Sequence, residues 1–371
     1  MHIGLIAPPG VPVPPLAYGG TESVVDRLAR GLVRAGHEVL LAAAANSACP
    51  VPRVGGTDEA AEAGPVCVDT VTELRHVIRS YAAMREVDVV HDHTLTGPLY
   101  RHPPAGPPVV TTAHGPFDAT MSPVYRAMRG VAVVAISYHQ AATADGIPVA
   151  AVIHHGLDVE SVPVGRGNGG YASFLGRMSP EKGPREAALV ARAAGVPLRM
   201  AAKLREPAER EYFDGEVKPL LCSDVEFLGE LGCAEKLELV GGSCALVNPM
   251  QWAEPFGLVM IEALATGTPV VATPVGSAPE IVDDGVTGYL RKGCAALADA
   301  LTAAADLDRA ACRAAAKSRF ATERMVREHV QLYTGVIGSD RPRARPRAVD
   351  HPASRRIGVL PRAGLASQLD A

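Results

Sequence analysis

Two glutamates in the second half of the chain are the first residues whose types and spacing could do chemistry. Glu254 and Glu262 lie in the stretch WAEPFGLVMIEALATGTPVVAT, with seven residues between them. The residues after Pro255 read as a helix, whose first backbone N–H groups would be unpaired donors at its positive end. These residues are Phe256, Gly257, Leu258 and Val259. Apolar neighbours can bury this helix, so Glu262 is free to face a cleft, where a carboxylate accepts bonds from paired hydroxyls such as those of a ribose.

A pair of cations stands at the start of the second half. Arg177 and Lys182 follow the strand-like run YASFLG in the stretch FLGRMSPEKG, where Pro180 reads as the entry to a helix. Cations at the mouth of a parallel strand, beside a helix start, suit a phosphate or a diphosphate. The alternative is that both are surface cations and that Glu181 pairs with one of them.

Histidines gather in the first half at what read as strand ends. The motif HDHT contains His91 and His93, and TTAHG contains His114. Histidines two residues apart share one strand face and could bind a metal, but no third ligand with convincing spacing follows. We therefore expect His91 and His93 to contact an acceptor or to pack at the strand end.

The apolar pattern predicts the elements that would position these residues. Short apolar runs such as HIGLIAP, PVVTTAHG and ALVNP alternate with helical patterns in both halves. Continuous apolar strands separated by helices indicate parallel sheets covered on both faces, with function beyond the carboxyl ends of the strands. A chain of 371 residues exceeds the size of one hydrophobic core, so we predict an α/β protein of two facing halves.

Composition excludes several classes of protein. The formal net charge of −4 gives no reason to expect a nucleic-acid partner. The seven cysteines form no C-x-x-C pair, which is typical of reduced thiols. The first residues do not resemble a signal peptide, and no apolar run is long enough to span a membrane. These features predict a cytoplasmic protein, either a monomer or a weak homo-oligomer.

Several stretches together resemble the family-4 retaining glycosyltransferases of GT-B fold. They are GRMSPEKG, VEFLGE and NPMQWAEPFGLVMIEALATGTPVVATPVGSAPEIVDDGVTGYL in the second half, and YGGTE, TTAHG and VIHHGLD in the first. The resemblance covers the chain from Met1 to about Ile337. The loop PPGVPVPPLAYGG and the Ala-, Arg- and Pro-rich composition also resemble sugar transferases of actinomycete antibiotic pathways, such as that of avilamycin.

The resemblance implies how the chain is organised. Two Rossmann-like domains would face one another across a cleft, with an N-terminal acceptor domain over 1–165 and a C-terminal nucleotide-sugar donor domain over 170–317. A helix over 318–338 would cross back to the N-terminal domain. Residues 339–371, which are rich in Arg and Pro and lack periodicity, are expected to form a disordered tail.

The resemblance also implies roles for single residues. Glu262 resembles the acid that binds the ribose hydroxyls, and Glu254 the acid that contacts the transferred sugar. Arg177 and Lys182 resemble the diphosphate clamp, which the amides of the following helix complete. His114 resembles a histidine near the reaction centre. The wall beside the base would comprise Phe227, Leu228 and Gly229, and the loop over the phosphates Gly19 and Gly20.

The implied activity is transfer of a sugar from a nucleoside-diphosphate sugar to a hydroxyl of a small-molecule or oligosaccharide acceptor, with retention and without a metal. The retaining step could be front-face attack or double displacement. A nicotinamide-dependent oxidoreductase would need a G-x-G-x-x-G after a strand, and none of the strand-like runs is followed by one. A non-catalytic sugar-nucleotide-binding protein is the other alternative, against which both glutamates and both cations argue. Trp252, where relatives often have small residues, suggests a pocket for an uncommon sugar.

Overall fold

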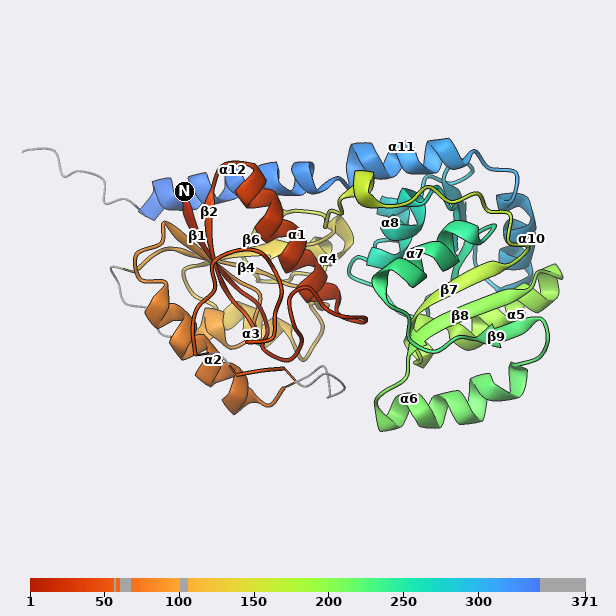
Figure 1. Cartoon of the computed structure of the whole chain (residues 1–371), viewed down its shortest axis with the longest axis horizontal. Helices are drawn as coiled ribbons and strands as arrows, with labels where there is room; N and C mark the ends of the chain where they lie inside the picture. The colour runs from red at the N-terminus through yellow and green to blue at the C-terminus, as the bar shows by residue number, and fades with distance from the viewer. Residues whose placement is uncertain (57, 61–67, 101–105, 341–371) are drawn as a thin grey trace, which may run out of the picture.

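The two halves of the chain form two α/β domains, each built on a six-stranded sheet (Figure 1). The computed structural model describes residues 1–56, 58–60, 68–100 and 106–340. The strand order is β2-β1-β3-β4-β5-β6 in the first domain and β12-β11-β10-β7-β8-β9 in the second. Neighbouring strands in both sheets run parallel. The predicted α/β class with two Rossmann-like domains is confirmed.

The first domain takes its sheet from the first 152 residues. Its strands are β1 (His2–Ile6), β2 (Glu38–Ala42), β3 (Val89–Asp92), β4 (Val109–Thr112), β5 (Val131–Ala135) and β6 (Val149–Val152). Its helices are α1 (Gly20–Arg34), α2 (Thr70–Ala83), α3 (Ser122–Ala127) and α4 (Tyr138–Ala142), with short 3-10 turns at η1 (Gly97–Leu99) and η2 (Val159–Ser161).

The second domain repeats the plan with a different strand order. Its strands are β7 (Ala172–Arg177), β8 (Leu198–Lys203), β9 (Val225–Phe227), β10 (Leu246–Asn248), β11 (Val270–Ala272) and β12 (Gly288–Leu290). Its helices are α5 (Pro184–Ala194), α6 (Pro207–Tyr212), α7 (Cys233–Gly242), α8 (Leu258–Ala265), α9 (Ala278–Ile281), α10 (Cys294–Ala304) and α11 (Arg309–Arg319). Short turns of other helix types are η3 (Pro180–Lys182), η4 (Phe213–Val217) and η5 (Lys218–Leu220).

Successive strand residues enter hydrophobic cores on opposite faces of each sheet. In β1, Leu5 packs in the core that includes α1, whereas Ile6 packs in the core on the other face. In β7, Phe174 and Leu175 likewise pack in the two cores on opposite faces of the sheet. Because strand side chains alternate in direction, a continuous apolar strand can be buried only where both faces are covered. The cores therefore explain why the strands read as unbroken apolar runs.

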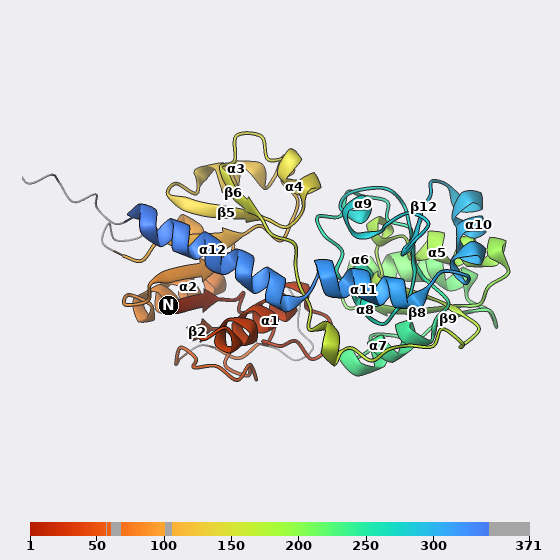
Figure 2. The same ribbon diagram turned by 90° about the horizontal axis from the view of Figure 1, so that it is seen from above.

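The last helix, α12 (Thr322–Asp340), returns to the first domain and lies along α1. Figure 2 shows α11 on the second domain and α12 extending across the first. The two chain segments that pass between the domains are bonded to each other, since Leu157 N–H donates to the Phe320 carbonyl and Thr322 N–H to the Leu157 carbonyl, both at 2.9 Å. Most of the expected tail, from residue 341 onward, lies outside the described residues.

Candidate active site

The start of α8 is the centre of the site that the sequence predicts. The helix begins at Leu258, two residues later than expected, and Gly257 precedes it with a left-handed φ of 86° and no side-chain cap. Among the described residues, no group accepts a hydrogen bond from the N–H of Gly257, Leu258 or Val259. Unpaired amides at the positive end of a helix form a ready anion-binding site.

The two predicted cations lie beside this helix end, each with a carboxylate partner. Lys182 forms an ion pair with Glu254, and both side chains are largely buried. Arg177, the last residue of β7, donates to Glu181 at 2.9 Å. The alternative in which Glu181 pairs with a cation is therefore correct for Arg177, yet the pairing leaves the guanidinium at the strand end where an anion site was expected.

The turn between these cations differs from the predicted helix entry. Pro180 begins a single 3-10 turn, and helix α5 begins only at Pro184. Gly183 separates the two with a left-handed φ of 74°, and a Cβ there would lie 2.3 Å from the Pro249 carbonyl oxygen. A residue with a side chain cannot satisfy both constraints, so the chain must turn at this glycine.

Glu262 is buried on α8 and its charge is stabilised from both domains. Its Oε1 accepts bonds from Lys236 Nζ at 2.9 Å and from Arg27 Nη2 at 3.3 Å. Burial opposes ionisation, but the two cations outweigh it and lower the pKa of Glu262 below its usual value. Within the described residues Oε2 has no partner. The side chain is thus an ionised acceptor with one oxygen open, beside a pocket of about 260 Å³ between α1, α7 and α8.

Several enclosed polar atoms near the strand ends of the second domain have no hydrogen-bond partner. Among the described residues, these are Arg177 Nε, Ser179 Oγ, Asn248 Nδ2, Trp252 Nε1 and Thr273 Oγ1. They lie at or after the carboxyl ends of β7, β10 and β11. Buried polar groups normally find partners, so a concentration of unpaired ones at one edge of a sheet indicates a place for a polar ligand.

The glycine loop of the first domain meets this edge. A Cβ on Gly20 would lie 3.4 Å from Leu258 at the start of α8, so the loop approaches the helix end closely. Gly19 is enclosed, and a Cβ there would lie 2.6 Å from Pro15. The structure therefore places Gly20, the residue next to Gly19, at the start of α8.

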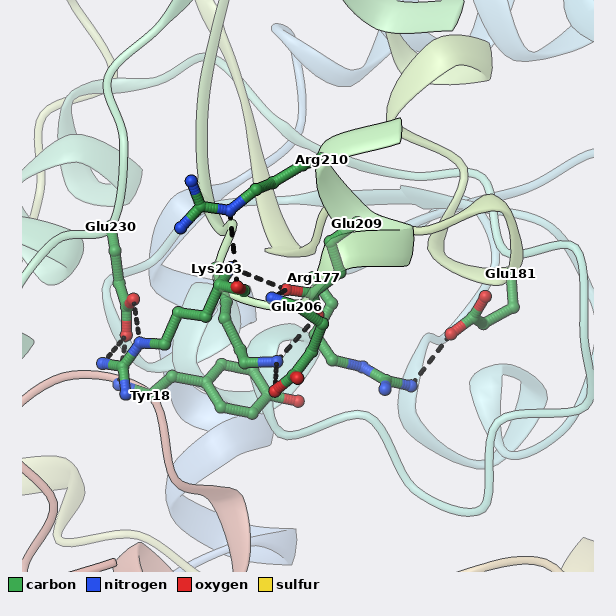
Figure 3. Close-up of polar contacts among 9 residues, drawn as sticks. Tyr18, Arg177, Glu181, Lys203, Glu206, Glu209, Arg210 and Glu230 are labelled. Atoms are coloured by element: carbon green, nitrogen blue, oxygen red, sulfur yellow. Dashed lines mark hydrogen bonds and ion pairs between the residues drawn. The ribbon is translucent and has the colours of Figure 1, made fainter. Parts of the chain in front are cut away.

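The residue before these glycines, Tyr18, reaches into the second domain, which the sequence did not predict. Its backbone N–H donates to Glu230 Oε1 at 3.0 Å, and Lys203 Nζ lies 5.7 Å from the centre of its ring. Figure 3 shows the ring beside Lys203, with the hydroxyl directed toward the side on which Arg177 lies. Lys203 ends β8 just as Arg177 ends β7, so its position at a strand end was the signal available in the sequence.

The predicted wall beside the base is the segment after β9. Leu228 N–H donates to the Met200 carbonyl, and the Gly229 carbonyl accepts from Ala202 N–H, both at 2.9 Å. These bonds to β8 fix the segment next to Lys203. Phe256, by contrast, is buried against His155, with ring centres 5.0 Å apart, so its side chain packs inside the protein and only its backbone is at the helix end.

The histidines of the first domain form a buried cluster with His155 and His329. His93 Nδ1 and His114 Nε2 are 2.9 Å apart, and the His114 ring stacks on His155 at 5.3 Å. Burial and neighbouring His329 lower the pKa of His114 to about 4, so its ring is neutral at pH 7. His114 is the partly exposed member of the cluster, so it is the one that a ligand outside the cluster can reach.

The expectation that His91 contacts an acceptor needs correction. His91 is fully buried, and its ring nitrogens lie 2.6 Å from Tyr333 Oη and 2.8 Å from Thr112 Oγ1. His93 is almost fully buried and bonds to His114. The alternative of strand-end packing describes His91, while His93 supports His114 from behind. In the described parts of the chain, no three histidine, cysteine or acidic side chains are grouped so as to hold a metal ion.

Glu280 on α9 is a second contact between the domains that the sequence did not predict. Its carboxylate accepts the N–H groups of Tyr138 at 2.9 Å and His139 at 2.7 Å, which begin helix α4 of the first domain. His154 Nε2 lies 2.8 Å from the same carboxylate. His154, in the stretch VIHHGLD, thus takes part in a contact between the domains. Over the described residues, no helix has both the length and the apolar composition to cross a membrane.

Each of the two domains matches a known protein family. The model described as Glycosyltransferase Family 4 matches residues 18–161, and that of Glycosyl transferases group 1 matches residues 165–319. A phosphatidyl-myo-inositol mannosyltransferase of Mycolicibacterium smegmatis is 29% identical over 328 residues, covering 78% of this chain and 80% of that protein.

Solved structures of similar proteins agree with these family matches. AviGT4, a glycosyltransferase involved in avilamycin A biosynthesis, is 27% identical with a TM-score of 0.68, covering 91% of this chain and 98% of that one. HepE of Anabaena, solved with UDP and glucose, is 21% identical with a TM-score of 0.69, covering 90% of this chain and 99% of that one, and supports the fold alone.

Fold, domain matches and relatives now agree. The two family models follow one another along the chain and divide it between the two sheets. An oxidoreductase is therefore no longer a competing explanation for the two Rossmann-like domains. The chain belongs to the GT-B glycosyltransferases, with a family 4 domain at its N-terminal side and a group 1 domain at its C-terminal side.

Proposed function

We propose that this glycosyltransferase moves a sugar from a nucleoside-diphosphate sugar to a hydroxyl of a small-molecule or oligosaccharide acceptor, with retention of configuration. The observation that carries the proposal is the start of α8. Three unpaired amides lie there beside Arg177 and Lys182, which together suit the two phosphates of a sugar nucleotide.

The same groups explain how the reaction would be accelerated. Breaking the bond between sugar and phosphate adds negative charge to the leaving diphosphate and positive charge to the anomeric carbon. Donors fixed where charge develops stabilise the transition state, and each typically contributes about 10²–10³ in turnover. Arg177, Lys182 and the helix amides would be the donors that act in this way, and their charge is the reason that the proposal includes no metal.

Donor binding would exchange the partners of these cations. Without a ligand, Glu254 neutralises Lys182 and Glu181 neutralises Arg177. A diphosphate offers both cations a stronger partner, because it carries more charge and more acceptor oxygens. Glu254 would then be free to bind the hydroxyls of the sugar, while Glu262 binds the ribose. His114 would approach the sugar from the first domain as a neutral hydrogen-bonding ring.

Natural-product biosynthesis is the setting that we propose. It is supported by AviGT4, whose described role is in avilamycin A biosynthesis and whose likeness extends over 91% of this chain. The mycobacterial relative is instead a phosphatidyl-myo-inositol mannosyltransferase. Identifying the acceptor of this chain would therefore show which of the two relatives it resembles in function.

The test is turnover with a panel of sugar nucleotides. The purified protein is incubated with UDP-, GDP- and ADP-activated sugars and candidate acceptors, and the released nucleoside diphosphate and the anomeric configuration of the product are measured. Transfer with retention, undiminished by EDTA, is expected. Nucleotide binding without turnover on any acceptor would favour the non-catalytic binder, and inversion would contradict the proposed stereochemistry. Metabolites of a strain lacking the protein should include an intermediate short by one sugar.

A further inference from the structure

The carboxyl ends of three neighbouring strands mark positions along the proposed donor site. Arg177 ends β7, Lys203 ends β8 and Phe227 ends β9, and Arg177 and Lys203 are register partners. Phe227 pairs with Met200, three residues before Lys203, but the Gly229 carbonyl accepts from Ala202 N–H, so the Gly229 end of the base wall lies beside Lys203. Lys203 therefore marks a midpoint between the diphosphate clamp on one neighbouring strand and the base wall on the other. A nucleoside joined to its diphosphate has to pass this midpoint.

A residue of the other domain covers this midpoint. The ring of Tyr18 lies against Lys203, with Nζ 5.7 Å from the ring centre, and the Tyr18 N–H donates to Glu230 at 3.0 Å. Glu230 directly follows the base wall in the chain. Tyr18 is therefore held between diphosphate clamp and base wall by one backbone bond and one ring contact, and both of these cross from domain to domain (Figure 3).

The groups that receive Tyr18 are themselves fixed. Lys203 is only 4% exposed, and its Nζ is bonded to Glu209 at 2.8 Å and to Glu206 at 3.3 Å. Arg205 binds the Glu230 carboxylate through two bonds, of 2.8 and 2.7 Å. Burial raises the pKa of Tyr18 to about 12, so the phenol is neutral and brings no charge that would repel a diphosphate. Supporting bonds of this kind hold a binding side chain in one geometry.

We propose that Tyr18 is a donor-binding residue supplied by the N-terminal domain, whose ring covers the nucleoside and stacks on the base of the nucleoside diphosphate. Glu230 is its positioning residue. This inference rests on the proposed function and adds a residue that the sugar nucleotide meets only when the domains are closed. Every base offers an aromatic face, so stacking can hold the base whatever its identity. Gly19 and Gly20 follow directly, so the same loop reaches the phosphates.

Calorimetric titration of the full chain with UDP, GDP and inorganic pyrophosphate tests this role. Loss of a base–aromatic stack costs about 1–3 kcal/mol, so Tyr18→Ala should weaken nucleoside diphosphate binding roughly tenfold to a hundredfold. The affinity for pyrophosphate should not change. Tyr18→Phe keeps the ring and should bind like the wild type. Glu230→Ala should weaken UDP or GDP binding, and Glu230→Gln should restore it, because an amide oxygen still accepts the Tyr18 N–H.

The matched control is Tyr289→Ala. It removes a ring that also has a cation contact, with Arg291 at 5.1 Å, on the far edge strand β12 of the same sheet. Nucleoside diphosphate binding to Tyr18→Ala that is as tight as to the wild type would overturn the proposal. Tighter binding by Tyr18→Ala would mean that the Tyr18 ring blocks the site. An equal loss of affinity for pyrophosphate would place the ring at the phosphates. A wild-type protein that binds no nucleoside diphosphate would instead refute the proposed function itself.

Discussion

Replacing His329 with phenylalanine should make the protein less sensitive to acid. His329 lies on α12 in the buried histidine cluster, next to His91 and Tyr333, and its Nδ1–H donates to the Met325 carbonyl at 2.9 Å. Burial, aided by the charge of Arg324, lowers the pKa of His329 from the usual 6.5 to about 4, against the opposing effect of that hydrogen bond. Phenylalanine keeps a ring in the cluster and removes the titration.

The size and sign of the effect follow from linkage. Because the folded pKa is lower than the unfolded one, the unfolded chain binds an extra proton between pH 6.5 and pH 4. The free energy of unfolding is therefore highest above pH 6.5 and falls as the pH drops toward 4. A difference of about 2.5 pKa units corresponds to about 3 kcal/mol. The lost hydrogen bond to Met325 costs His329→Phe about 1 kcal/mol at every pH.

The assay is urea unfolding followed by far-UV circular dichroism at pH values from 7 to 4. The difference in free energy of unfolding between His329→Phe and the wild type should move by about 3 kcal/mol in favour of the variant over this range. Carboxylates titrate too, but they do so in both proteins and cancel in the difference. A charged His329 also lowers the pKa of His91, His93, His114 and His155, so its removal raises their pKa values and adds to the change in the same direction.

The control is Val326→Ala, a non-titrating change at a buried position of the same helix. It should destabilise the protein by about 1–2 kcal/mol, and by the same amount at each pH. A difference for His329→Phe that is as flat with pH as that of Val326→Ala would refute the argument that His329 is held neutral in the fold.

Three further predictions concern the proposed site. Glu262→Ala should weaken the binding of UDP or GDP roughly tenfold to a hundredfold in calorimetry, because a charged acceptor is lost, and unchanged affinity would contradict the ribose assignment. Arg177→Ala should lower kcat about 10²–10³-fold with a smaller effect on acceptor KM. By contrast Arg185→Ala, which removes a partly exposed side chain of α5 with partners Glu186 and Glu216, should leave both unchanged. His93→Phe removes the bond that holds His114 and should lower kcat about two- to tenfold without changing the Kd for nucleoside diphosphate, and a change in Kd alone would contradict its positioning role.

The elements were predictable because local patterns determine them. Val24, Leu28 and Leu32 form one face of α1, and the apolar strand runs could be stable only in covered parallel sheets. The turn at Pro180 was not predictable in the same way. Pro180 and Pro184 are both acceptable first residues of a helix, and only the Pro249 carbonyl, more than 60 residues away in the chain, decides that the turn at Gly183 comes first.

The site was predictable in part, since strand ends on one sheet must meet. Arg177, Lys182 and Glu254 are brought together by the second domain alone, so the fold class was sufficient to group them. The contacts of Tyr18 with Glu230 and of Arg27 with Glu262 join residues 212 and 235 positions apart. No local periodicity records such pairs, because they depend on how one whole domain is placed against the other.

The contacts between the domains that the sequence did not predict have one feature in common, and it affects how the domains move. Glu230, Glu262 and Glu280 all belong to the second domain, and each accepts hydrogen bonds from donors of the first. A hydrogen bond to a charged group contributes about 1.5–3 kcal/mol net, so we expect these contacts to favour the closed arrangement of the domains. Arg27 and Lys236 share one oxygen of Glu262 and leave the other open. We therefore expect a ribose to bind the open oxygen while Arg27 stays in place, so that the donor and the closed arrangement of the domains stabilise each other.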